Sequence, residues 1–395
     1  MHIEKKVVPL PNEITKHPMA YIHTYNIVTP LGHNLQHTLA ELLRGKSAIA
    51  PHQGYGQLEP IPLSVVPTQP LQQHYHAHYQ QPATKLEQML LLCASPLIEA
   101  ITVTKRTALV LSTTKGNITD LSNPHTQPLP FLSDLAHTLA HRLGITTQPI
   151  VLSNACVSGA MALSVADRLL EGGIYDSALV LAGDVVSEFV LSGFASFQAL
   201  SAQPCKPYDA HRDGITLGEA AAAVYLTRNP QGASAKILGS SSINDANHIS
   251  GPSRTGEGLY QSVQNAMRQA NITHEALALI NAHGTGTLYN DEMESIAFAR
   301  AGLTHVPLNS YKGYFGHTLG ASGLLETVLT AALLRQGLLL KSIGFETLGV
   351  SEPINVLTTT QKTNRRHFLK TASGFGGSNT ALVLEVSSQR SESKE

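Results

Sequence analysis

One cysteine in this chain stands where covalent catalysis could begin. Cys156 lies in "SNACVSG", between an apolar stretch, "QPIVLSNA", and a helical pattern, "GAMALSVADRLLEGG". A strand, a sharp turn and a helix would put this thiol at a helix N-terminus, where free N–H groups and the helix dipole stabilise a thiolate. A buried structural cysteine is the alternative interpretation of this stretch taken alone.

Three later segments add polar or aromatic residues beside glycines. His283 ends an apolar run in "NAHGTGT", and His317 follows Lys312 by five residues in "NSYKGYFGHTLGASG". In "TASGFGGSN", Phe375 lies between glycines just after a strand pattern. Glycines at strand ends let a ligand approach the backbone of an α/β fold. A cysteine nucleophile with two imidazole donors suits thioester chemistry.

The elements around these segments predict an α/β protein. Strand patterns precede the cysteine and the first histidine, and "GASGLLETVLTAALLRQG" predicts an apolar helix after the second. Two successive runs of strand–helix alternation, with a break near residues 227–235, suggest a duplicated α/β unit. The expected divisions are an N-terminal arm, two halves and a flexible tail, at residues 1–18, 19–230, 231–388 and 389–395.

The composition favours a heavily buried enzyme. Hydrophobic residues make up 42% of the 395 residues, and 27 basic residues balance 28 acidic ones. A net charge near zero gives no global attraction to nucleic acid or anionic membranes. No apolar run reaches the length of a membrane-spanning helix, so we expect no stable membrane insertion. Cys93, Cys156 and Cys205 have no metal-type spacing, which favours a reducing, cytoplasmic location.

A histidine-rich stretch is a second candidate for chemistry. His74, His76 and His78, in "LEPIPLSVVPTQPLQQHYHAHYQQP", would share one face of a strand and could bind a metal there. However, no carboxylate or cysteine accompanies them, and the prolines and glutamines favour an irregular excursion over the surface. We expect a solvated loop.

Taken in order, the motifs resemble those of the β-ketoacyl-acyl carrier protein synthases of the thiolase superfamily. The match includes "NIVTPLG", the cysteine turn, "FQALS", "CKPYDAHRDGITLGEAAAAVYL", "NAHGTGTLYND", "KGYFGHTLGASG" and "GFGGSN". The resemblance implies the thiolase fold, a duplicated αβαβα architecture of five layers with two mixed five-stranded sheets. It also implies decarboxylative Claisen condensation of malonyl-acyl carrier protein with a cysteine-bound acyl group, in fatty-acid, polyketide or pigment chain elongation.

The resemblance also implies residue roles. Cys156 resembles the acyl-accepting nucleophile, and His283 and His317 resemble the pair that stabilises the enolate left when carbon dioxide departs. Lys312 resembles the lysine that supports this pair, and Glu326 a buried acid of the same network. The other implied roles belong to the N–H groups of Cys156 and Phe375 as oxyanion hole, the Phe375 side chain as gate, Thr285 and Thr287 at the pantetheine arm, and Phe194 in the acyl pocket.

The implied partner is an acyl carrier protein, whose phosphopantetheine carries the substrates. We expect no metal and no nicotinamide, because loss of carbon dioxide itself generates the carbanion. A homodimer is expected, with a heterodimer containing a chain-length-factor-like subunit as the alternative. The set of motifs looks closest to stand-alone synthases of aryl-polyene or flexirubin-type pigment clusters.

Three other functions compete with this interpretation. A thiolase would need a second cysteine near the C-terminal glycines, but the last cysteine is Cys205. A priming synthase would resemble a Cys-His-Asn set, whereas His317 stands where that branch has asparagine. A non-catalytic chain-length-factor-like subunit usually lacks the nucleophile, so Cys156 argues against it. The turn itself departs from the family, because Asn154 precedes "AC" where many members have an acid or threonine.

Overall fold

A computed structural model of the chain describes residues 19–55, 60–122, 131–245 and 251–388. The expected arm at 1–18 and tail at 389–395 lie outside these residues. Ten strands form one mixed sheet in the order β11-β10-β14-β15-β9-β1-β8-β6-β4-β5. The sheet consists of two groups of five strands, which join where Tyr21 and Ile22 of β1 pair with Lys236 and Ala235 of β9.

Each half of the chain supplies one group of strands. The first group contains β1 (Tyr21–Val28), β4 (Thr107–Ser112), β5 (Ile150–Leu152), β6 (Ser177–Asp184) and β8 (Ala220–Thr227). The second group contains β9 (Ala235–Asn244), β10 (Leu277–Asn281), β11 (Leu308–Asn309), β14 (His367–Gly374) and β15 (Ser378–Val386). Both groups combine parallel and antiparallel pairs. The predicted pair of mixed five-stranded sheets is therefore confirmed.

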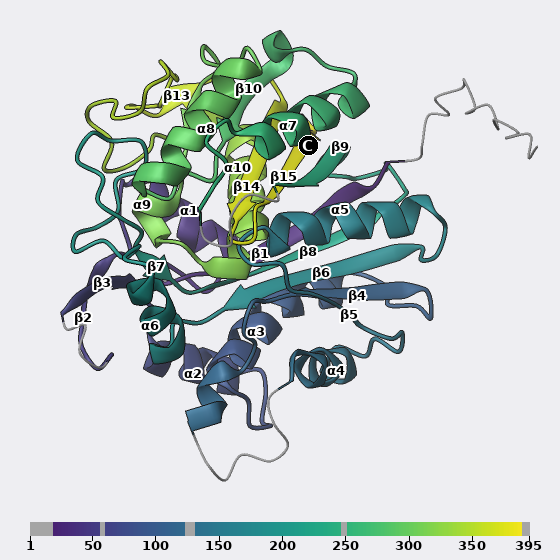
Figure 1. Cartoon of the computed structure of the whole chain (residues 1–395). Coiled ribbons are helices and arrows are strands. Elements are labelled where there is room, and N and C mark those ends of the chain that lie inside the picture. The colour runs from purple at the N-terminus through teal and green to yellow at the C-terminus, as the bar shows by residue number, and fades with distance from the viewer. Residues whose placement is uncertain (1–18, 56–59, 123–130, 246–250, 389–395) are drawn as a thin grey trace, which may run out of the picture.

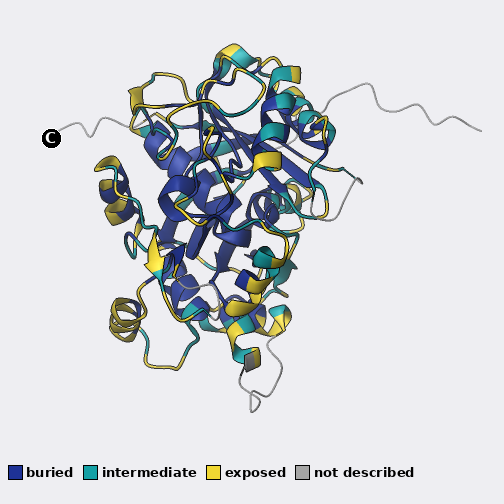
Figure 2. Ribbon diagram, turned by 60° about the vertical axis from the view of Figure 1, so that its left-hand side comes forward, coloured by how far each residue is buried: buried dark blue, intermediate teal, exposed yellow. Residues whose placement is uncertain are grey.

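Helices complete five layers (Figure 1). Two central helices, α5 (Ser158–Glu171) and α10 (Ser322–Arg335), pack on each other and contact strands of both groups. On the outer faces, α3 (Lys85–Ala100) and α4 (Leu132–Arg142) cover the first group, and α7 (Glu257–Ala270) and α8 (Leu288–Arg300) cover the second. Helix α10 is buried from Ser322 to Leu334, because the central layer leaves none of its faces in solvent (Figure 2).

Glycines set the spacing of the two central helices. A Cβ atom on Gly323 of α10 would lie 2.3 Å from the backbone nitrogen of Ala160 in α5. A Cβ atom on Gly159 of α5 would lie 2.7 Å from the nitrogen of Leu324. The helices can therefore approach this closely because both positions lack a side chain.

Shorter elements complete the structure. A small sheet has the order β2-β3-β7. The remaining elements are β2 (Ala50–His52), β3 (Ile61–Ser64), β7 (Leu217–Gly218), β12 (Leu338–Leu339), β13 (Gln361–Lys362), α1 (Leu35–Leu43), α2 (Thr68–His76), α6 (Glu188–Ser196), α9 (Lys312–Phe315) and the 3₁₀ helices η1 (Ile118–Ser122), η2 (His274–Ala276) and η3 (Leu319–Ala321). Within the described ranges, every helix is too short or too polar to cross a membrane.

His74 and His76 lie in helix α2, so the predicted loop is wrong there, whereas His78 lies in the turn that follows. All three side chains are exposed, as predicted. Helix α2 ends at His76. The helix forms because Leu71 and Tyr75, four residues apart, are both buried and anchor one of its faces. The ring of His74 lies edge-on to His78, with 5.0 Å between centroids. Successive positions of a helix do not put His74 and His76 on one side as a strand would. These three do not form a metal-binding group among the described residues.

Candidate active site

A strained turn presents the cysteine. Cys156 lies between β5 and α5, and Ala155 before it has a φ of 44°, in the left-handed region that side-chain-bearing residues rarely adopt. The Ser158 hydroxyl holds this turn: it accepts from the N–H of Asn154 at 2.8 Å and donates to the carbonyl of Ala155 at 2.6 Å. The predicted position at the entrance of a helix is confirmed, since α5 begins two residues later.

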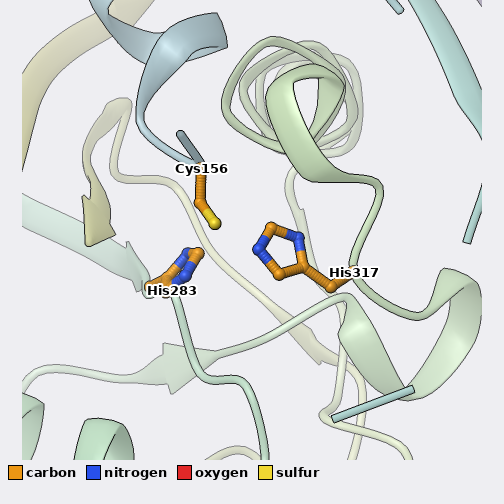
Figure 3. A group of neighbouring side chains, drawn as sticks. All are labelled: Cys156, His283 and His317. Carbon is orange, nitrogen blue, oxygen red and sulfur yellow. The ribbon is translucent and has the colours of Figure 1, made fainter. Parts of the chain in front are cut away.

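Cys156, His283 and His317 converge from separate segments of the chain (Figure 3). The sulfur and one ring nitrogen from each histidine lie within 4.8 Å of one another. The two imidazole rings meet edge to face, with centroids 5.1 Å apart and an interplanar angle of 85°. Sulfur and imidazole nitrogen also bind soft cations such as Zn²⁺, so this trio has the atoms to hold an ion. The expectation of no metal stays a prediction.

The trio opens onto a cavity of about 390 Å³. Aromatic rings form much of its wall: Phe375 contacts Phe194 and Phe197, with centroids 5.5 and 5.4 Å away. Thr285 and Thr287 also line the cavity, and their hydroxyls are 2.9 Å apart. The structure thus brings every residue named for the acyl pocket, the gate and the pantetheine arm to one cavity.

The hydrogen bonds of His317 fix its tautomer. Its Nδ1 accepts from the backbone N–H of Leu319 at 3.1 Å and lies 2.8 Å from the hydroxyl of Ser322. A backbone N–H can only donate, so Nδ1 carries a lone pair and the neutral ring has its proton on Nε2. That Nε2 is buried with no partner among the described residues. Its N–H is free to donate to a substrate.

Two carboxylates of α8 hold the loop that carries His283. Glu294 accepts from the N–H groups of His283 and Gly284, at 2.8 and 2.6 Å. Asp291 accepts from the N–H groups of Thr285 and Gly286, at 2.9 and 3.1 Å. Sequence reasoning missed both roles. The available signal was "NDEME", which puts two acids three residues apart at the start of the helix after "HGTGT".

Burial and positive charge keep both histidines neutral. Removal from water lowers the pKa of His283 and of His317 well below the ordinary value, and the Lys312 charge lowers both further. At neutral pH each ring therefore has one N–H donor and one acceptor. Neutral imidazoles of this kind stabilise a developing enolate by hydrogen bonding.

The expected pair of Lys312 and Glu326 is present with an additional partner. Lys312 Nζ donates to the carbonyl of His283 at 2.6 Å and to Glu326 Oε1 at 2.8 Å, so it holds the backbone of His283 rather than its ring. Lys370 of β14 contacts the other carboxylate oxygen, Oε2, at 2.5 Å. Sequence reasoning missed Lys370, although a lysine inside the strand-like "HFLKTASG" was a signal.

The expectation of a thiolate in the resting protein is wrong. Burial raises the pKa of Cys156 to about 11 and outweighs the opposing effects of the Lys312 charge and the Phe375 N–H, which donates to the sulfur. The segment before Phe375 can lie this close to Cys156 because Gly374 has no side chain. A Cβ atom there would lie 3.1 Å from the nitrogen of Cys156.

Comparison with known proteins identifies the family. The N-terminal domain of β-ketoacyl synthases matches residues 99–231, and the C-terminal domain matches residues 234–346. The chain belongs to the β-ketoacyl synthase family. The ketosynthases are acyltransferases, and the predicted family is confirmed. The division of the whole chain into 19–230 and 231–388 stays a prediction.

Relatives of this synthase chain include proteins of fatty-acid synthesis. A 3-oxoacyl-[acyl-carrier-protein] synthase 2 of Rhizobium meliloti is 33% identical over 62% of each chain. A Schizosaccharomyces pombe protein named as a mitochondrial 3-oxoacyl-[acyl-carrier-protein] synthase is 26% identical over 91% of this chain and 96% of its own. The structure of a ketosynthase in complex with its chain length factor, from Xenorhabdus doucetiae, matches with a TM-score of 0.79 and 27% identity, covering 93% of this chain and 98% of that one.

Proposed function

We propose that this chain holds an acyl group on Cys156 and condenses it with malonyl-acyl carrier protein to give a 3-oxoacyl product. The observation that carries the proposal is the convergence of Cys156, His283 and His317 within 4.8 Å beside a cavity of about 390 Å³. A nucleophile and two neutral imidazoles are the groups that acyl transfer and decarboxylative condensation require.

Acyl transfer comes first in the proposed cycle. The sulfur of Cys156 attacks the carbonyl carbon of the incoming thioester, the bond to the pantetheine sulfur breaks, and the thiol proton passes to that departing sulfur. The N–H groups of Cys156 and Phe375 stabilise the transient oxyanion. The Phe375 N–H supports this role because it already donates to the sulfur of Cys156.

Condensation follows when malonyl-acyl carrier protein enters. The bond to the malonyl carboxylate breaks, carbon dioxide leaves, and the electron pair stays on the thioester as an enolate. His317 donates from Nε2, which its hydrogen bonds leave protonated and free, and His283 is the second donor. The enolate carbon then attacks the acyl carbonyl on Cys156, and the sulfur leaves as a thiolate that takes up a proton. No strong base and no nicotinamide takes part in this cycle.

We assign the substrate contacts to the remaining cavity residues. Thr285 and Thr287 bind the pantetheine arm, Phe194 lines the acyl pocket, and Phe375 separates that pocket from the malonyl position. The ring contact between Phe194 and Phe375 supports this, because turning one ring changes the space beside the other. We also propose that no metal is bound during turnover and that the chain acts in the cytoplasm, which its three free cysteines favour.

The proposed assembly contains a carrier protein and a second subunit. We propose an acyl carrier protein as the substrate-delivering partner and a homodimer as the resting assembly. Structures of related proteins favour a second arrangement, a heterodimer: they include ketosynthases with chain length factors from Xenorhabdus doucetiae and from ishigamide synthesis. Mass measurement of the purified chain, alone and after co-expression with a candidate chain-length-factor-like subunit, distinguishes the two.

Mass spectrometry of the acyl-enzyme tests the function. The purified chain is mixed with acyl carrier proteins loaded with chains of several lengths, and the Cys156 peptide is examined for an added acyl mass. Cys156→Ala is expected to abolish condensation and leave malonyl decarboxylation measurable. Condensation retained by this variant would remove Cys156 as nucleophile. No acyl mass with any chain would favour a non-catalytic, chain-length-factor-like subunit.

A further inference from the structure

Beneath the two histidines, two buried lysines share one buried carboxylate. Lys312, Glu326 and Lys370 are 0, 2 and 0% exposed. One carboxylate therefore faces two ammonium groups, one on each oxygen. Removing an ammonium group from water is costly, so a second buried lysine at this place calls for a function.

Both lysines also hold the segment that delivers His283. Lys312 Nζ donates to the carbonyl of His283, while Lys370 Nζ lies 3.5 Å from the carbonyl of Asn281, two residues earlier. Asn281 pairs with Lys370 in the register of β10 and β14. The end of β10 is thus tied to Glu326 through one lysine on each side.

We infer that Lys370 is a positioning residue for the condensation: it fixes the Glu326 carboxylate and the end of β10, and through them the place of His283. The inference rests on the proposed function, because it concerns the decarboxylation of the malonyl group. Lys370 does not touch the three reacting side chains. Its charge also lowers the pKa of His283 and of His317. Its effect on the place of His283 runs through Glu326, Lys312 and the backbone of His283.

Loss of the Lys370 charge should slow decarboxylation and leave acylation of Cys156 unaffected. Burial lowers the pKa of Lys370, the Glu326 carboxylate raises it, and the Lys312 charge lowers it again. Lys370→Met removes this ammonium group and leaves Glu326 with Lys312 alone. Glu326 is then held on one oxygen only, and a misplacement of His283 by about 1 Å is enough to reduce a rate about 10²-fold. Acyl transfer to Cys156 does not depend on the enolate donors.

The experiment measures the two half-reactions separately in the full chain. Lys370→Met is expected to lower kcat for malonyl-acyl carrier protein decarboxylation by at least about 10-fold, with KM and the rate of Cys156 acylation within about twofold of wild type. Lys370→Arg, which keeps the cation, is expected to retain more decarboxylation than Lys370→Met. Leu369→Ala is the matched control, since it loosens the same buried strand without changing charge.

A double variant with Glu326→Gln distinguishes a positioning role of Lys370 from a general loosening of the strand. If Lys370 acts through the carboxylate, Glu326→Gln with Lys370→Met decarboxylates no more slowly than Glu326→Gln alone. Leu369→Ala should instead add its own loss. Should Lys370→Met not fold, Lys370→Leu takes its place in the same cycle, because it also removes the ammonium group and keeps an apolar side chain in the buried strand.

The outcomes are distinguishable from failure of the proposed function. Wild type that neither acylates Cys156 nor decarboxylates malonyl-acyl carrier protein refutes the function itself. Active wild type with unchanged decarboxylation in Lys370→Met, or with both half-reactions lowered in parallel, overturns only the role of Lys370. A selective loss of decarboxylation that Lys370→Arg partly restores supports it.

Discussion

The contact between the two central helices controls the distance from the nucleophile to one of its histidines. Cys156 lies at the entrance to α5, and Ser322, the first residue of α10, binds Nδ1 of His317. Gly323 follows Ser322, and its missing side chain permits the close contact with Ala160 of α5. Any side chain at Gly323 therefore pushes apart the two helices that carry opposite sides of the site.

Gly323→Ala is the smallest such perturbation. The new Cβ would lie 2.3 Å from the nitrogen of Ala160, so the helices must separate by about 1 Å to reach an ordinary contact near 3.4 Å. Over-packing of a buried contact costs about 1–3 kcal/mol, and the better helix propensity of alanine offsets up to about 1 kcal/mol of it. A displacement of about 1 Å between reacting groups is worth about 10²-fold in rate.

The assay compares stability with chemistry. Urea denaturation should report a modest loss of stability, while condensation should fall by roughly 10²-fold and acylation of Cys156 should be less affected. Gly193→Ala in α6 is the control, because nothing lies within 4 Å of its new Cβ. Gly323→Ala with wild-type condensation would refute the argument that this helix contact sets the geometry of the site.

Three further predictions follow from the site. His283→Ala and His317→Ala should each stop malonyl decarboxylation yet permit some acylation of Cys156; if both steps survive in both variants, the histidine assignment fails. Alkylation of Cys156 by iodoacetamide should keep accelerating to about pH 11, above the ordinary thiol pKa of 9.0. Because the folded pKa is raised, the stability contributed by the protonated thiol is present below pH 9 and is lost between about 9 and 11, which denaturation at several pH values measures. Phe194→Ala should shift the acyl chains found on Cys156 toward longer ones in a competition experiment, and an unchanged distribution would exclude Phe194 as a wall of the acyl pocket.

The sequence predicted best what depends on local pattern. Strand-to-helix turns at Cys156 and His283 followed from apolar runs that end in small residues, and the apolar helix after His317 followed from its uninterrupted pattern. The helix at Thr68–His76 was missed because Leu71 and Tyr75 are its buried anchors, and two apolar residues among glutamines and histidines are a weak signal. The sequence could not predict the partners of buried charges. Lys370 and Glu326 are 44 residues apart and meet only because β14 packs on α10.

The protonation of the nucleophile shows why placement in the fold outweighs local sequence. A cysteine at a helix entrance is expected to ionise, yet Cys156 is 8% exposed and burial favours the neutral thiol. The same burial keeps His283 and His317 neutral and strengthens each hydrogen bond that they can donate. The three reacting groups are therefore neutral at rest. Such a site suits a reaction in which negative charge appears only transiently, on an enolate or an oxyanion.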